Sequence, residues 1–204
     1  MNTASKNQSP AKGGKRARTR AALVQAAAEL VGTKGLEQTS LEDVAQRAGM
    51  TRGAIYGNFK DRDELFLAVM EARWQPVVPK FKPGASYERQ MRILAEAVIA
   101  ALPARRSASI GAASFQFYAL THEKMRARFV QLNSEAYRRA AEEMLAYIPE
   151  RKLPMPAQVF VRVLHGIIEG LTFLSFLTPE LITEEVILAA FDALGSSKPG
   201  RRTA

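Results

Sequence analysis

The sequence TSLEDVAQRAGMTRGAIYGNFK, residues 39–60, contains two short helical patterns separated by a glycine. The first pattern ends at Gly49, where a tight turn needs a positive φ. Apolar residues at helical spacing give each pattern a side to bury: Leu41, Val44, Ala45 and Ala48 in the first, and Ile55 and Phe59 in the second. Two short helices joined by a turn of about three residues are typical of a helix-turn-helix, which we expect over 40–59.

Residues that cap helices occur at the expected helix starts. Thr39, followed three residues later by Glu42, predicts a capping box for the first helix. Thr51 is placed to cap the second helix. Asp61 with Glu64 predicts a second capping box, which starts the helix that follows.

The second helix of the pair carries the residue types that a DNA-reading helix needs. Arg52 lies in its first turn, where a guanidinium can bind a guanine or a phosphate. Gly53 and Ala54 let the backbone approach the floor of the groove, and Ala54 can contact a thymine methyl. Each residue alone is as typical of capping, packing or a solvated surface. Together they predict a DNA site at Thr39, Ser40, Thr51, Arg52, Gly53, Ala54, Tyr56 and Lys60.

Positive charge is concentrated around this segment. Residues 1–60 hold ten Lys or Arg against four acidic residues, in a chain of net charge +9. Residues 61–197 are neutral overall, and the last seven residues add three cations. A basic terminal module on a neutral body favours a polyanion-binding head, although basic tails also aid solubility or bind membranes.

Several function classes find no support in the sequence. There is no cysteine, and His122 and His165 have no partners at metal-ligand spacing, so we expect no metal site and no cofactor. Phosphate loops and nucleophile elbows are also absent, which argues against an enzyme. The apolar stretch 157–178 is interrupted by charges, which predicts a buried helix rather than a membrane span. Without the apolar segment of a secretory signal, the expected compartment is the cytoplasm.

No segment alternates at period two, so the fold class is predicted to be all-α with about nine helices. Outside the helix-turn-helix, helices are expected from Lys15 to the glycines at 32 and 35, after residue 61, and over 87–102, 107–121, 122–148, 156–177 and 183–194. The predicted organisation is a disordered basic tail at 1–14, a helix-turn-helix domain at 15–62, an effector-binding and dimerisation domain at 63–195, and a second basic tail at 196–204.

The expected helix at 156–177 is apolar almost all round and therefore needs cover on two sides. One side can be its own domain and the other a second copy of the chain, with Gly166 and Gly170 permitting close approach. The alternative is the central helix of a monomer. The predicted dimer interface consists of Leu164, Ile167, Leu171, Leu174, Ile187 and Phe191.

Aromatic and soft side chains on the middle helices are candidates for an effector pocket, although most are typical of an ordinary core. These candidates are Met91, Phe115, Phe117, Tyr118, Tyr137 and Met144. Polar groups that can orient a ligand are Arg92, Gln116, Asn133 and Glu169, although each is more typical of a solvated face or an interface. If the aromatics and methionines line a cavity, the effector is expected to be apolar and fairly large.

Residues 19–66, TRAALVQAAAELVGTKGLEQTSLEDVAQRAGMTRGAIYGNFKDRDELF, resemble the N-terminal domain of TetR-family transcriptional regulators. The shared features include the Gly35 turn, the Thr39-Ser40 start, the 53–56 run and the acid-Leu-Phe ending at 64–66. The sequence TRGAIY, residues 51–56, is most similar to the branch of the family that represses multidrug efflux pumps. The resemblance implies a larger helical domain that dimerises and holds an effector. Asn58 stands where the family usually has His or Tyr; since Asn can donate a hydrogen bond to phosphate, it joins the predicted DNA site.

The leading hypothesis is a homodimeric repressor of a palindromic operator on double-stranded DNA, released by a small, apolar effector. An alternative is a DNA-binding protein without a ligand, either constitutive or regulated by a protein partner. A third hypothesis makes the body an enzyme or carrier, which would need convergent titratable groups that the sequence does not reveal.

Overall fold

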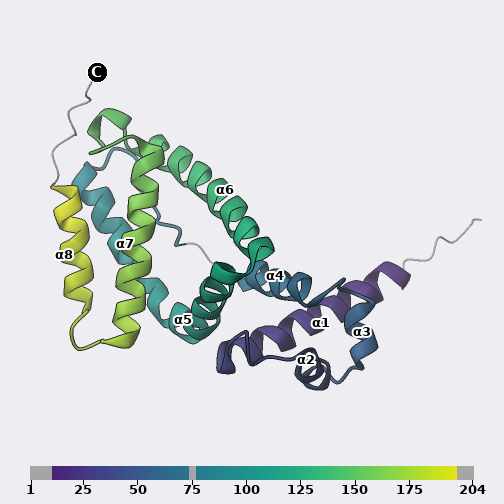
Figure 1. Ribbon diagram of the computed structural model, residues 1–204. Coiled ribbons are helices and arrows are strands. Elements are labelled where there is room, and N and C mark those ends of the chain that lie inside the picture. Colours follow the sequence, from purple (N-terminus) through teal and green to yellow (C-terminus); the bar gives the residue numbers. More distant parts are fainter. Residues whose placement is uncertain (1–10, 74–76, 197–204) are drawn as a thin grey trace, which may run out of the picture. The chain divides into compact units, whose positions relative to one another are not determined.

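The computed structural model describes residues 11–73 and 77–196. This part of the chain contains eight α-helices and one short 3-10 helix, and none of its residues lies in a strand (Figure 1). The prediction of an all-α fold with about nine helices is confirmed. The predicted tails at 1–10 and 197–204 lie outside the described residues. Residues 11–14, also assigned to a disordered tail, belong to the first helix.

The described chain divides into two compact units. The first comprises residues 11–73 and 110–126, and the second comprises residues 77–109 and 127–196. The predicted domain boundary after residue 62 falls inside the first unit, because α4 (Arg62–Arg73) packs against α1 (Ala11–Lys34).

The first unit is built around α1, which also contacts α2 (Leu41–Arg47) and α3 (Arg52–Tyr56). The buried apolar side chains of these helices and their connections form its core: Leu23, Val31, Leu36, Val44, Ile55, Phe59, Leu65 and Phe66. The predicted inner side of the helix-turn-helix is confirmed at five of its six positions, while Ala48 is half-buried. Helical spacing of apolar residues therefore fixes which side of each short helix faces inward.

Gly35 marks the end of α1. Its φ of +82° lies in the left-handed region, which side chains of L-residues disfavour. A Cβ at this position would also lie 2.9 Å from the Ser114 hydroxyl oxygen. Gly32, expected to help end the helix, instead lies within α1.

The cap of α2 differs from the prediction. Ser40, not Thr39, is the N-cap residue, and Asp43 takes the place expected for Glu42. The Asp43 backbone N–H donates to Ser40 Oγ at 3.0 Å, and the Ser40 N–H donates to Asp43 Oδ2 at 3.1 Å. Thr39 is drawn away because its hydroxyl donates to the Gly35 carbonyl at 2.7 Å. The capping box of α2 therefore starts one residue later than the sequence analysis predicted.

Ser40→Ala is expected to lower the free energy of unfolding by about 1 kcal/mol, because the first turn of α2 loses its side-chain acceptor. Glu42→Gln is expected to change it by less than about 0.5 kcal/mol, since Glu42 takes no part in the cap. Urea unfolding followed by circular dichroism measures both values. A loss at Glu42 as large as that at Ser40 would contradict the observed cap.

Another prediction that fails concerns α5 (Tyr87–Thr121), which was expected as two helices separated at Pro103. The helix continues through this proline. A proline within a helix removes one backbone hydrogen bond and crowds the preceding turn. Its neighbours Ala101, Leu102, Ala104 and Arg105 are all strong helix formers, which favours continuation.

The second unit consists of the first part of α5 with α6 (Glu123–Tyr147), the 3-10 helix η1 (Glu150–Lys152), α7 (Ala157–Leu177) and α8 (Glu184–Gly195). Residues 123–126 of α6 belong to the first unit. One core cluster joins the four α-helices, with members that include Met91, Leu94, Val98, Ala141, Met144, Phe160, Leu164, Ile187 and Phe191. Both α7 and α8 thus give one side to their own unit.

Candidate nucleic-acid interface

A tight turn connects α2 to α3. Gly49 has a φ of +64°, as the sequence predicted for this position. The Met50 N–H donates to the Ala45 carbonyl at 2.9 Å, and the Gly49 N–H donates to the Gln46 carbonyl at 3.0 Å, which closes the C-terminus of α2. Thr51 then occupies the N-cap position of α3, although its side chain makes no capping hydrogen bond.

The two sides of α3 differ sharply. Ile55, at 0% exposure, and Phe59, at 2%, anchor it in the core of the first unit, and the Arg20 guanidinium lies 4.5 Å from the centre of the Phe59 ring. Arg52, Gly53 and Tyr56 face solvent. Ala54 is half-buried between the two sides, and Lys60 is exposed just beyond. An anchored apolar back and a solvated front are what a helix needs to enter a major groove.

Arg52 has two protein partners on the exposed side. Its Nη2 donates to the Tyr56 hydroxyl at 3.1 Å, one turn along α3. Its Nη1 forms an ion pair with the Glu42 carboxylate of α2. The Tyr56 hydrogen bond, followed by the charge of Glu42, raises the pKa of Arg52, so the guanidinium is charged whenever it meets DNA.

Asn58 turns back onto its own helix. Its Nδ2 donates to the Ala54 carbonyl at 2.8 Å, and its Oδ1 is buried without a hydrogen-bond partner among the described residues. The side chain therefore satisfies the end of α3 instead of facing a phosphate. Its place in the predicted DNA site is not supported by this orientation.

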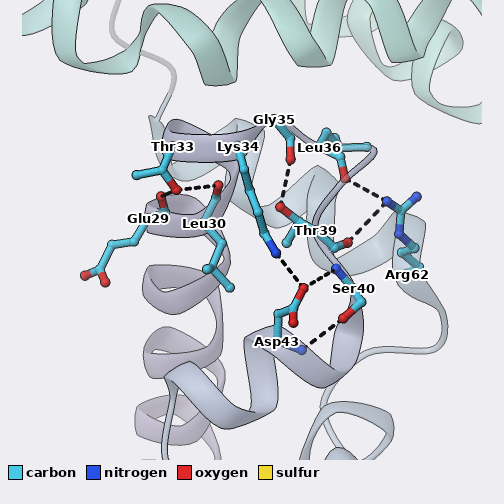
Figure 2. Close-up of polar contacts among 10 residues, drawn as sticks. All are labelled: Glu29, Leu30, Thr33, Lys34, Gly35, Leu36, Thr39, Ser40, Asp43 and Arg62. Carbon is cyan, nitrogen blue, oxygen red and sulfur yellow. Dashed lines mark hydrogen bonds and ion pairs between the residues drawn. The ribbon is translucent and has the colours of Figure 1, made fainter.

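The loop before α2 is held by polar contacts (Figure 2). Thr39 is 1% exposed, so its hydroxyl is unavailable to DNA, whereas Ser40 is exposed. Lys34 at the end of α1 pairs with Asp43 at 2.6 Å. The hydrogen bond from Lys34, with those from Ser40, lowers the pKa of Asp43 to about 2. The start of α2 is thereby tied to the end of α1.

Arg62 supports the same loop from α4, a role that the sequence analysis missed. Its Nη2 donates to the Leu36 carbonyl at 2.8 Å, and its Nη1 donates to the Tyr118 hydroxyl at 3.3 Å. Tyr118 donates in turn to Asp63 at 2.9 Å, and burial is the main cause that raises its pKa. Since Arg62 and Tyr118 are 56 positions apart, no local pattern could have paired them.

The predicted effector residues do not form one site. Phe115 and Tyr118 are buried in the first unit, and Phe117 is 70% exposed. Met91 and Met144 are packed in the core of the second unit, with Tyr137 half-buried against it. Helical spacing could not separate these groups, because α5 contributes to both units.

The predicted dimer interface also needs correction. Ile187 and Phe191 have 0% exposure and Leu164 has 4%, so they belong to the core of their own unit. Ile167 and Leu171 are half-buried, and Leu174 is exposed. The solvent-facing side of α7 instead carries the following residues: Val159, Val163, Gly166, Gly170, Phe173, Leu174 and Leu177.

Comparisons with known proteins agree with this arrangement. The family model of bacterial regulatory proteins of the tetR family matches residues 23–69. The HTH-type transcriptional regulator SrpR from Pseudomonas putida is 26% identical over 162 residues, which cover 76% of this chain and 74% of SrpR.

Two solved structures share the fold. NalD from Pseudomonas aeruginosa, the secondary repressor of the MexAB-OprM multidrug efflux pump, aligns with a TM-score of 0.57 and 24% identity over 89% of this chain and 97% of NalD. A transcriptional regulator from Saccharomonospora viridis in complex with choline aligns with a TM-score of 0.66 and 14% identity, over 87% of this chain and 95% of that chain.

The family match contains the whole α2–turn–α3 segment whose exposed side is described above. The chain is therefore a helix-turn-helix DNA-binding transcriptional regulator. Within that class, its residues 23–69 match the model of bacterial regulatory proteins of the tetR family.

Arg52→Ala is expected to weaken binding to a duplex selected from random DNA by about tenfold or more, because the base contact predicted for its guanidinium would be lost. Asn58→Ala is expected to change the affinity by less than about twofold, since its amide is used within the protein. Fluorescence anisotropy on the same labelled duplex measures both variants. Equal losses would show that Asn58 leaves Ala54 and contacts the DNA.

Proposed function

We propose that the chain is a homodimeric repressor that binds a palindromic operator and is released from it by a small effector. The observation that carries the proposal is the recognition helix α3, anchored through Ile55 and Phe59 and presenting Arg52 to solvent. Binding of double-stranded DNA at the exposed front of α3, with Ser40, Thr51 and Lys60 near phosphates, follows from this orientation. Repression is supported by the fold shared with NalD.

Dimerisation would take place through α7 and α8. The exposed apolar side of α7 includes Phe173 at 51% and Leu177 at 65% exposure, and α8 adds Val186. A Cβ built at Gly166 or Gly170 meets nothing within 4 Å, so this side leaves room for a second backbone. A continuous apolar side next to such space favours a helix-to-helix interface between two copies.

Phe173→Glu is expected to raise the dimer dissociation constant by roughly tenfold or more, because a carboxylate would be buried in an apolar interface. Operator affinity should fall with it, since two heads are needed to read a palindrome. Val130→Glu on α6, at a side chain of similar exposure, is the control. Sedimentation velocity measures the dimer. Unchanged dimers in the Phe173 variant would reject this interface.

The effector is proposed to bind in the second unit near Tyr137. The Tyr137 hydroxyl and His165 Nδ1 lie 2.7 Å apart, and their rings meet edge to face at 5.5 Å. Glu169 pairs with Arg105 at 2.9 Å and lies 3.9 Å from His165 Nε2. Burial lowers the pKa of His165, against the opposing charge of Glu169, so the imidazole is neutral at pH 7.

This cluster offers a few polar groups beside an apolar core, which suits a mostly apolar ligand with one polar end. The choline complex of the Saccharomonospora viridis regulator supports a small-molecule effector in this fold. Cationic and neutral compounds are both candidates for this ligand.

Tyr137→Phe is expected to raise the effector concentration needed for operator release by about tenfold, while operator affinity without effector changes by less than about twofold. Effectors are first sought by thermal shift among aromatic cations and neutral aromatic compounds. If a compound releases the operator equally well from both proteins, Tyr137 has no role in its binding. If no compound stabilises the protein, regulation without a ligand or by a protein partner is favoured.

The cytoplasm is the proposed compartment, and gene regulation without a catalytic step is the proposed activity. Helix α7 is long and apolar enough to cross a membrane by composition. However, Phe160, Val161 and Leu164 on one side of α7 pack in the unit core, and the other side is accounted for by the proposed dimer.

A further inference from the structure

We propose that Glu42 determines the DNA specificity of the helix-turn-helix. It would do so by holding the Arg52 guanidinium in an orientation that reads a base and away from phosphates. The proposal uses the DNA-binding role of α3 and is independent of the proposed dimer and effector. Glu42 would act through Arg52, as a positioning residue on the DNA-facing side.

The capping geometry of α2 leaves the Glu42 side chain available for this role. Asp43, and not Glu42, closes the capping box with Ser40. Glu42 lies in the first turn of α2 with a side chain that is 57% exposed, and it pairs with Arg52, whose side chain is 58% exposed. Both residues line one open groove of about 580 Å³ together with Ser40. The carboxylate and the guanidinium are therefore presented to solvent side by side.

Arg52 is held from two helices at once. Glu42 of α2 binds one terminal nitrogen, while Tyr56 of α3 accepts from the other at 3.1 Å. The guanidinium carbon also lies 5.7 Å from the centre of the Tyr56 ring. An arginine that is oriented before binding loses less conformational freedom when it meets a base, which favours the matching base pair.

The Glu42–Arg52 ion pair is expected to contribute little to folding stability, so we attribute its role to DNA binding. Exposed ion pairs contribute little to folding, because water and salt screen them. A carboxylate at the DNA surface repels phosphates, which penalises non-specific contacts that depend on charge alone. Within the major groove it can instead accept from a cytosine amino group beside the guanine read by Arg52.

Other ion pairs described in the first unit leave the recognition helix out. Arg47 pairs with Glu29, and Lys34 pairs with Asp43, so these two pairs join α2 to α1. The Glu42–Arg52 pair involves the recognition helix itself. This distinguishes Glu42 from acids that only support the fold.

The test compares Glu42→Gln with Glu37→Gln, which removes the same charge from an exposed residue lining the same groove. Each variant is titrated with an operator selected from random DNA and with a random duplex, over a range of salt concentrations. For Glu42→Gln, the ratio of operator to random-duplex affinity is expected to fall about tenfold. The salt dependence on random DNA should steepen by about one phosphate contact, as Arg52 becomes free to bind phosphate.

The control and a second background keep the result interpretable. Glu37→Gln should raise both affinities in proportion and leave their ratio unchanged within about twofold. In an Arg52→Ala background, Glu42→Gln should no longer change the ratio, because the residue that it positions is absent. Thermal unfolding checks that the variants remain folded. The proposal would be overturned if the Glu42 and Glu37 variants had the same ratio of operator to random-duplex affinity. It would also be overturned if Glu42→Gln lowered this ratio as much in the Arg52→Ala background as in the wild-type background.

Discussion

The burial of Ile55 and Phe59 is the constraint on which the DNA-binding surface depends. Both side chains are fully inside the first unit, so α3 can neither rotate nor slide without exposing them. Because the buried side of the helix is fixed, the side chains of Arg52 and Tyr56 face solvent. The chemistry of recognition thus follows from packing: the core selects the side, and the sequence of that side supplies the donors.

Packing of α3 alone would leave the other helix of the pair free to move. The loop before α2 is restrained by a guanidinium, because Arg62 donates to the Leu36 carbonyl (Figure 2). The same guanidinium also donates to the Tyr118 hydroxyl. Backbone carbonyls in a loop need partners when they are removed from water, and a single arginine supplies several donors. Through Tyr118, the end of α5 becomes part of the support of the helix-turn-helix. A displacement of the end of α5 would therefore alter the support of the loop before α2.

Sequence reasoning located the helix-turn-helix because its signals are local: apolar spacing and Gly49 act within a few residues. It failed where two neighbouring residues could each cap a helix, and where the contact partner of a residue lies far away in the sequence. The cap moved from Thr39 to Ser40 because Gly35 offers Thr39 a carbonyl, and this depends on loop shape. Ile187 was assigned to a dimer surface, since an apolar residue on an amphipathic helix gives no sign of whether its own chain or another one covers it.

The positive charge of residues 1–60 has to be interpreted together with the ion pairs that its cations form. A count over residues 1–60 suggests a strong, indiscriminate attraction to phosphates. However, Lys34, Arg47 and Arg52 each have a carboxylate partner within the protein, and DNA has to compete with those partners. Competition weakens contacts that rely on charge alone more than contacts that combine charge with a matching base edge. Pairing of these three cations is therefore expected to lower non-specific affinity more than affinity for a matching sequence.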